Sequence, residues 1–378
     1  MSGPSPAGPL AAPLLLLLLP PLLLPVGGAD LCYDDRPREA GLYDGEMTVD
    51  AIKRSYVLFV PAGYDGHHPA PLVINCPNTG ATAMQELEQS GLLKAAKRYG
   101  FILVTLNAVN NAFNVIENAL AVETGVDDTK FVGVLLDYLS RRLCVDTDRV
   151  FATGISRGGR FTSHLASEMA GDIAAVGIIS GLRFPRPNNA TRPVPVISFH
   201  GTKDPVNPYE AGGPNYWQTG VEEAARDWAA FNGCTKQATN RIAKSIVKVL
   251  YYDCADNADV VLFRIEGGGH TWPGSEFYYE HQKRLHLGAA TLDISANDLM
   301  WDFWTEHVEL RGDKHYWKHH TMPNEEPFAP DGRKATRRTG KGEGGPAGQA
   351  AESAEERAEE RAEKRAERHR AAAAEEAA

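Results

Sequence analysis

Short, almost uninterrupted apolar runs recur along the middle of the chain and alternate with segments of helical character. A strand that is apolar at nearly every position is buried on both faces, as in parallel sheets covered by helices. We expect strands at 56–60, 72–74, 101–105, 149–153, 175–179, 194–199, 246–252 and 260–265, and helices at 84–99, 129–143, 160–169, 221–232 and 295–307. The alternation predicts an α/β protein with a mostly parallel central sheet and helices on both faces.

The two ends of the 378-residue chain differ in composition from its middle. A short leucine-rich run, interrupted by prolines and followed by small residues, predicts a secretory signal peptide over residues 1–28. Residues 325–378 are low-complexity sequence rich in Ala, Glu and Arg, for which we expect disorder or a solvated helix. The intervening residues 30–312 are long enough for one domain with a substantial core. We therefore expect a secreted, extracellular protein with no membrane anchor after cleavage.

Charge limits the classes of partner. The formal net charge is −10, and no basic stripe with interleaved aromatic residues is present, so we expect no nucleic-acid partner. The oligomeric state is left open. The sequence Asn189-Ala190-Thr191 is a glycosylation sequon, which predicts a glycan on Asn189 if the chain is secreted.

Five cysteines in a chain expected to be secreted indicate disulfides and one remaining thiol. Cys234 and Cys254 lie close in sequence and flank the strand expected at 246–252, so they form the first predicted pair. Cys32, near the start of the mature chain, and Cys144, just before the strand at 149–153, form the second. Cys76 ends an apolar strand and is expected to be a buried free thiol.

One serine lies in a turn that suits a nucleophile. Ser156 is the centre of Gly154-Ile155-Ser156-Arg157-Gly158, between an expected strand and an expected helix. Glycines without a Cβ allow the chain to turn tightly and hold the serine hydroxyl in a strained, exposed position. The context therefore predicts a nucleophile elbow rather than a chance pentapeptide.

A serine hydroxyl needs a base, and the base needs an acid that fixes its tautomer and stabilises its charge. Asp204 and His270 each follow the end of an expected strand, where parallel sheets hold their sites. They also follow Ser156 in the order Ser, Asp, His. We assign Asp204 as the acid and His270 as the base, although Asp204 also suits an ordinary turn. His200 is a competing base that we expect to support the acid loop instead.

The oxyanion hole needs backbone donors. The N–H of Arg157, which follows the nucleophile, is the first candidate. The second is expected in the loop after the strand at 72–74, where Pro77 has no N–H, so Thr79 is preferred and Asn78 comes next. For substrate stacking we consider three aromatic residues, with core packing as the alternative for each: Trp272, Trp217 and Tyr216.

Several longer motifs accompany these residues. They include Val126-Asp127-Asp128, the run from Phe199 to Val206 (FHGTKDPV) and the run from Glu266 to Gly274 (EGGGHTWPG). Across about residues 54–307 the chain resembles the secreted serine esterases of carbohydrate esterase family 1, which include feruloyl and acetyl xylan esterases. It is similar also to the related polyhydroxybutyrate depolymerase-like esterases.

The resemblance implies an α/β-hydrolase fold, a Ser156, Asp204 and His270 triad, and no metal or organic cofactor. It also supports both cysteine pairs. The chain departs from the family at Pro77-Asn78, where the family usually has His-Gly, and this concerns the second oxyanion donor.

Three functions follow from the sequence. The first is a secreted carboxylic-ester hydrolase acting through an acyl-enzyme on feruloyl or acetyl esters of a plant-type polysaccharide such as xylan. The second is a polyester depolymerase that cleaves hydroxyalkanoate esters. The third is a catalytically inactive protein that binds carbohydrate or a partner, for which the Pro77-Asn78 loop is the sole hint.

Overall fold

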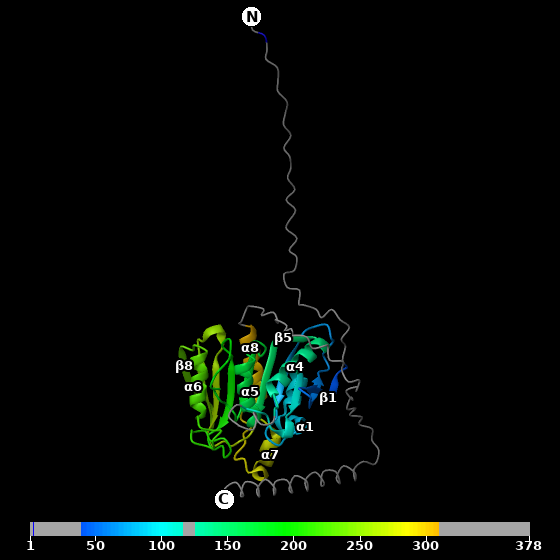
Figure 1. Cartoon of the computed structure of the whole chain (residues 1–378). Coiled ribbons are helices and arrows are strands. Elements are labelled where there is room, and N and C mark those ends of the chain that lie inside the picture. The colour runs from blue at the N-terminus through cyan, green and yellow to red at the C-terminus, as the bar shows by residue number, and fades with distance from the viewer. Residues whose placement is uncertain (1–2, 4–38, 116–124, 310–378) are drawn as a thin grey trace, which may run out of the picture. The chain divides into compact units, whose positions relative to one another are not determined.

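The computed structural model describes residues 3, 39–115 and 125–309 (Figure 1). The chain divides into two compact units, Met1–Thr336 and Arg337–Ala378. The second unit lies wholly outside the described residues. The predicted tail, Cys32 and, apart from residue 3, the predicted signal peptide also lie outside them.

The described residues form one ten-stranded sheet with the order β1-β2-β4-β3-β5-β6-β7-β10-β9-β8. The six central strands, β4, β3, β5, β6, β7 and β10, run parallel to one another. Antiparallel strands extend the sheet at both edges, with β1 and β2 at one edge and β9 and β8 at the other. The prediction of a mostly parallel sheet is therefore confirmed. The strands are β1 (Gly41–Val49), β2 (Ile52–Val60), β3 (Ala70–Cys76), β4 (Ile102–Asn107), β5 (Val145–Ile155), β6 (Ala175–Ile179), β7 (Val196–Gly201), β8 (Lys236–Ala243), β9 (Ile246–Tyr252) and β10 (Val260–Ile265).

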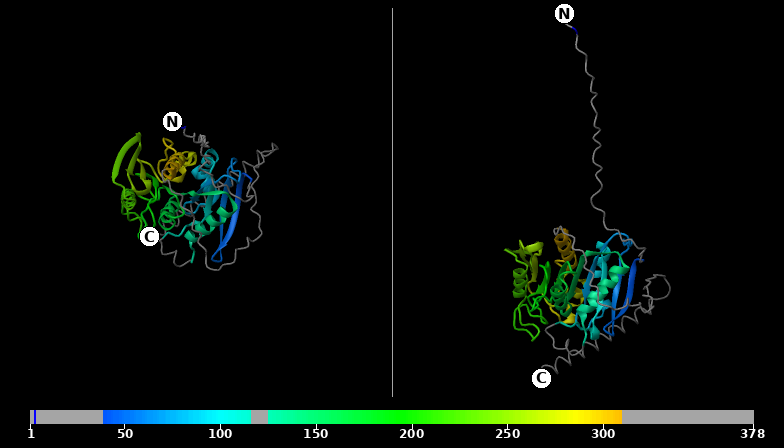
Figure 2. Two further views of the ribbon diagram at one scale, coloured as in Figure 1. Left: turned by 90° about the horizontal axis from the view of Figure 1, so that it is seen from above. Right: turned by 45° about the horizontal axis from the view of Figure 1, so that its top comes forward.

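Helices cover both faces of the sheet, as Figure 2 shows. The helices α4, α5 and α6 contribute to one apolar cluster, and α1, α2, α7 and α8 contribute to the other. The α-helices are α1 (Ala83–Ser90), α2 (Leu92–Tyr99), α4 (Asp128–Arg142), α5 (Arg157–Glu168), α6 (Val221–Phe231), α7 (Glu276–Leu285) and α8 (Ala296–Glu309). Two short 3₁₀ turns are η1 (Val109–Asn111) and η2 (Ala255–Asn257). No described helix has the length and apolar content needed to cross a membrane.

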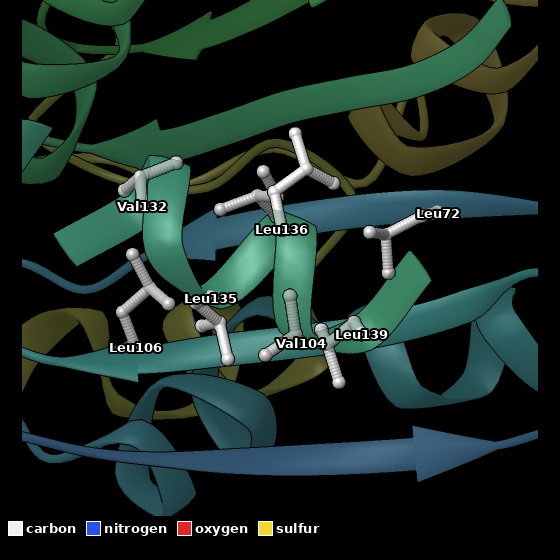
Figure 3. A pocket seen from close by; sticks show the side chains of 8 residues that line it. Leu72, Val104, Leu106, Val132, Leu135, Leu136 and Leu139 are labelled. Carbon is white, nitrogen blue, oxygen red and sulfur yellow. The ribbon is translucent and has the colours of Figure 1, made fainter. Parts of the chain in front are cut away.

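The packing of α4 illustrates how the layers meet. Leucines on one face of α4 lie against the strands β3 and β4, and Figure 3 shows Leu135 and Leu139 beside Val104. The space between them has no room for a water molecule, since its volume is about 0 Å³. Along β3, Leu72 and Ile74 belong to this cluster while Val73 belongs to the opposite one. This alternation explains why the strand is apolar at each position from 72 to 74.

Four elements differ from the sequence prediction. The helix expected at 84–99 is two helices, because Gly91 adopts a left-handed conformation (φ 70°) that ends α1 and begins α2. The strands β1 and β8 and the helix α7 were not predicted. β8 is exposed along most of its length and α7 buries only Tyr278, so neither carries the apolar pattern on which the prediction depends.

The cysteines follow the predicted pattern where the structure describes them. Cys234 and Cys254 form the predicted disulfide. Cys144 is also disulfide-bonded, and its predicted partner Cys32 lies outside the described residues. Cys76 is a buried free thiol at the end of β3.

A buried ion pair joins the antiparallel edge to the helix layer. Arg54 on β2 is 2% exposed and donates to the carboxylate of Asp128 on α4. The second oxygen of Asp128 accepts the backbone N–H of Asn114 at 2.6 Å, and the Arg54 guanidinium lies over the Phe131 ring. Both charges are thus compensated inside the protein.

We expect Arg54→Met to lower the free energy of unfolding by about 3–5 kcal/mol, because it leaves the Asp128 carboxylate buried without its cation. Urea unfolding followed by tryptophan fluorescence measures this change. The neighbouring Lys53 provides a matched control, since its ion pair with Glu46 is exposed and is worth ~0–1 kcal/mol. Equal stability of Arg54→Met and Lys53→Met would show that the buried pair contributes nothing specific.

Candidate active site

Ser156 stands between β5 and α5 in a strained backbone conformation, with φ 59° and ψ −122°. Side-chain-bearing residues seldom adopt a positive φ, and such strain costs about 1–3 kcal/mol. The two flanking glycines are required by close approach. A Cβ at Gly154 would lie 2.5 Å from the Cys76 carbonyl oxygen, and one at Gly158 would lie 2.5 Å from that of Pro77. The turn is therefore built to present the Ser156 side chain.

Asp204 and His270 lie in loops that follow neighbouring parallel strands. Asp204 comes just after β7, and His270 follows β10. Two hydrogen bonds join the loops. The N–H of Lys203 donates to the carbonyl of Gly268 at 2.9 Å, and the N–H of Gly267 donates to the side-chain hydroxyl of Thr202 at 2.8 Å. The structure thus brings the predicted acid and base together at the carboxyl edge of the sheet.

The acid and the base are in direct contact. His270 Nδ1 lies 2.7 Å from Asp204 Oδ2, and both side chains are almost fully buried. The other carboxylate oxygen of Asp204 accepts the backbone N–H groups of Val206 and Asn207, each at 2.8 Å. This network fixes the carboxylate so that one oxygen faces the imidazole. His270 Nε2 is left on the side of the ring away from Asp204.

Two histidines stabilise the negative charge of Asp204. Burial acts to raise the pKa of Asp204, but hydrogen bonds from His200 and His270, with their charges, outweigh it and hold the pKa below its usual range. His200 Nε2 lies 3.3 Å from Asp204 Oδ2 and 2.8 Å from the carbonyl oxygen of Asn207. His200 therefore supports the acid loop, as the sequence suggested. It is 1% exposed, which removes it from contact with a substrate.

A chain of contacts links the nucleophile turn to the acid loop. The N–H of Ser156 donates to the carbonyl of Ile179 at 3.0 Å, at the end of the adjacent strand β6. One residue further, the carbonyl of Ser180 accepts the Asn207 side-chain amide at 2.7 Å. Asn207 in turn binds Asp204. Asn207 was not predicted from the sequence, although Asp204 and Asn207 have the i, i+3 spacing of a capped turn.

The Ser156 side chain is partly buried, and among the described residues no hydrogen bond joins its hydroxyl to His270. Such bonds are often long without substrate and shorten in the reacting complex. The placement of Ser156, Asp204 and His270 at one edge of the sheet is compatible with a triad, which stays a prediction.

The backbone N–H groups of the loop after β3 are the candidates for the second oxyanion donor. Pro77 has none, and the N–H of Gly80 donates to the carbonyl oxygen of Asn111 at 2.8 Å. The N–H of Thr79 makes no hydrogen bond within the described residues, and Thr79 is exposed. Arg157, the first residue of α5, likewise has an N–H without a partner there. These are the two N–H groups predicted for the oxyanion hole, and that role stays a prediction.

Two of the three aromatic residues considered for substrate stacking are core residues. Trp272 and Trp217 are fully buried, with their indole N–H groups bound to Asn297 and to the carbonyl of Pro208. Both side chains are therefore packed in the core, which is the alternative considered for them. The ring centroid of Trp217 also lies 5.7 Å from that of His200. Tyr216 is partly buried, and its ring lies beneath the Arg160 guanidinium at 4.3 Å.

A hollow of about 170 Å³ adjoins α5. Its lining includes Arg160, His164, Arg183, Phe184 and Thr219. Arg160 follows Ser156 by one helical turn, so this hollow lies beside the beginning of the nucleophile's helix.

The structure shows the surroundings of the predicted glycosylation site, and it can be searched for side chains that could bind a metal. Asn189 is exposed, and its side-chain amide donates to the Glu168 carboxylate at 2.9 Å, so glycosylation there stays a prediction. No cluster of three His, Cys, Asp or Glu residues that could hold a metal ion is present within the described residues.

No family model matches the chain. It is 26% identical over 249 residues to feruloyl esterase B of Piromyces equi, an alignment that covers 62% of this chain and 46% of that protein. It is 30% identical over 186 residues to the bifunctional acetylxylan esterase/xylanase XynS20E of Neocallimastix patriciarum, which covers 48% of this chain and 24% of that protein. The chain thus spans less than half the length of these two relatives.

Among solved structures, the chain is similar to an acetyl xylan esterase from Aspergillus awamori. The TM-score is 0.46 at 16% identity, and the match covers 60% of this chain and 94% of that one. The fold described above, with its parallel central sheet and two helix layers, is of the α/β-hydrolase type. In sequence, the chain is similar to feruloyl and acetyl xylan esterases.

Proposed function

We propose that this chain is a secreted serine esterase that cleaves feruloyl or acetyl esters of a plant-type polysaccharide. The observation that carries the proposal is the 2.7 Å contact between His270 Nδ1 and Asp204 Oδ2, at the same edge of the sheet as the strained Ser156. The named activities of the relatives support an ester as the substrate. Secretion rests on the leader-like sequence of residues 1–28.

In the first half of the reaction, His270 Nε2 accepts the proton of the Ser156 hydroxyl as its oxygen attacks the ester carbonyl. Asp204 keeps the other proton on Nδ1 and stabilises the imidazolium. The new negative charge on the carbonyl oxygen is taken up by the N–H groups of Arg157 and Thr79. The carbon–oxygen bond to the alcohol then breaks, and the alcohol leaves with the proton from His270.

In the second half, a water molecule attacks the acyl group on Ser156 and gives its proton to His270. The tetrahedral intermediate expels the serine oxygen, which regains that proton. The carboxylic acid product departs, and the enzyme returns to its starting state. No step requires a metal or an organic cofactor.

A panel of esters tests the substrate class. We expect purified mature protein to hydrolyse methyl ferulate or acetylated xylan faster than a 3-hydroxybutyrate oligomer, with Ser156→Ala protein as the blank. Hydrolysis of the oligomer alone would replace the polysaccharide proposal with polyester depolymerase activity. No labelling by a fluorophosphonate probe would favour an inactive binding protein.

A further inference from the structure

One buried asparagine forms hydrogen bonds with both the acid loop and the segment after β6. Asn207 is 1% exposed, its backbone N–H donates to Asp204 Oδ1 and its carbonyl accepts from His200 Nε2, each at 2.8 Å. Its side-chain amide donates to the carbonyl oxygen of Ser180 at 2.7 Å. A carbonyl oxygen can only accept, so the nitrogen of the amide is the atom that faces Ser180. The backbone of Asn207 therefore supports the acid loop, and its side chain connects that loop with the segment after β6.

The segment after β6 lies directly against the nucleophile turn. A Cβ on Gly181 would lie 2.5 Å from the carbonyl oxygen of Ser156, so the two backbones are in close contact. The preceding residue, Ser180, is 1% exposed and has φ 46°, and its N–H donates to the carbonyl of Phe199 on β7 at 2.9 Å. A residue with a side chain keeps such a conformation only where its surroundings hold it. The Asn207 amide is one of the groups that hold this strained residue.

We propose that Asn207 is a positioning residue whose side-chain amide aligns the Ser156 hydroxyl with the His270 imidazole. This inference rests on the proposed esterase function. The base is placed by the acid loop, because His270 Nδ1 lies 2.7 Å from Asp204 Oδ2. The nucleophile is placed by its own turn and by the Ser180 segment that contacts it. Since the amide joins these two parts of the site, it fixes one relative to the other.

Asn207→Ala tests the inference, because it removes the amide and keeps the backbone N–H that donates to Asp204. Pre-steady-state hydrolysis of p-nitrophenyl acetate gives the acylation rate constant and the dissociation constant of the ester separately. We expect the acylation rate constant to fall by about a hundredfold, as for a misplacement of about 1 Å between reacting groups. The dissociation constant should stay unchanged, because the amide does not contact the substrate.

The pH dependence of acylation shows through which group the amide acts. The pH at which the rate falls on the acid side reports the His270 imidazole, and in Asn207→Ala it should not move, because the contact between Asp204 and His270 remains. Asn207→Asp serves as a second variant if the alanine variant does not fold. It has the shape of asparagine, but its ionised carboxylate cannot donate to Ser180, so we expect at least the same loss.

Asn232 provides the matched control. It is fully buried, and its side-chain amide donates to the carbonyls of Val194 and Ala258, each at 2.7 Å. These two residues precede β7 and β10, so the contacts lie at the amino edge of the sheet, opposite the proposed site. Asn232→Ala should lower the urea midpoint at least as much as Asn207→Ala, because two buried carbonyls lose their donor. The acylation rate constant of the folded control should stay unchanged.

The outcomes separate this inference from the proposed function. Acylation by folded Asn207→Ala at the original rate, or an equal loss in Asn232→Ala, overturns the inference and leaves the esterase proposal intact. A shift of the acid-side pH in Asn207→Ala also overturns it, because the amide would then act through the acid and the base. Unmodified protein that neither hydrolyses an ester nor reacts with a fluorophosphonate overturns the esterase proposal itself.

Discussion

Replacing Ser156 with alanine is expected to reduce kcat for ester hydrolysis by about a millionfold, leaving a rate roughly a thousand- to ten-thousandfold above the uncatalysed reaction from binding and the oxyanion hole. The hydroxyl is the one group that forms the acyl-enzyme, and no neighbouring group can take its place in the strained turn at φ 59°. Pre-steady-state hydrolysis of p-nitrophenyl acetate, with the ester in excess over the protein, measures the loss, because the burst of nitrophenol should disappear together with steady-state turnover.

A fluorophosphonate probe gives a second reading that does not depend on the natural substrate. The unmodified protein should be labelled once per chain and Ser156→Ala not at all. Ser245→Ala is a suitable control, because its hydroxyl lies 3.4 Å from the Asp293 carboxylate and has no role in the proposed reaction. Retained labelling of Ser156→Ala would mean that another serine is the nucleophile, and the proposed site would have to be abandoned.

The central strands were predictable because burial on both faces leaves a strong sequence signal. β3 is apolar at each position from Leu72 to Ile74 since successive side chains enter opposite helix layers. The edge strand β8 leaves no such signal. Its residues are mostly exposed, and its place is determined by antiparallel pairing with β9, which a local pattern does not reveal.

The reacting groups could be predicted for a related reason. Ser156, Asp204 and His270 each follow a buried strand, and parallel strands bring their carboxyl ends to one edge. The supporting role of Asn207 and the burial of individual side chains could not be predicted, because both depend on tertiary contacts. Glu86 and Glu88 are two residues apart in one short helix and look equivalent in the sequence, yet one is fully buried and the other is exposed.

For the aromatic residues, the sequence left substrate stacking and core packing both open. Trp272 and Trp217 lie near the motifs in sequence, so substrate stacking was a reasonable hypothesis for both. In the fold each indole turns inward and satisfies its N–H, with Asn297 for Trp272 and Pro208 for Trp217. Proximity to a catalytic motif along the chain does not establish on which side of the loop a large side chain lies.

The two histidines near Asp204 allow the proposed base to be distinguished from its neighbour. We expect His270→Gln to lower kcat by about a millionfold, comparable to loss of the nucleophile, because no other group would take the Ser156 proton. His200→Gln should cost far less, about tenfold to a hundredfold, since the Asp204 and His270 contact at 2.7 Å does not require it. Both variants carry an uncharged amide of similar size, so the comparison isolates the position.

The two substitutions should also differ in how kcat depends on pH. With His200→Gln, the His270 imidazole still takes the proton, so the fall in kcat at acid pH should remain. With His270→Gln, the residual activity should lose that fall and rise with hydroxide concentration, because water or hydroxide then supplies the only base. Equal losses in the two variants would indicate that His200 is more than a support for the acid loop. A larger loss in His200→Gln would move the base to that residue, although its 1% exposure argues against this, because a base must reach the hydroxyl that it deprotonates.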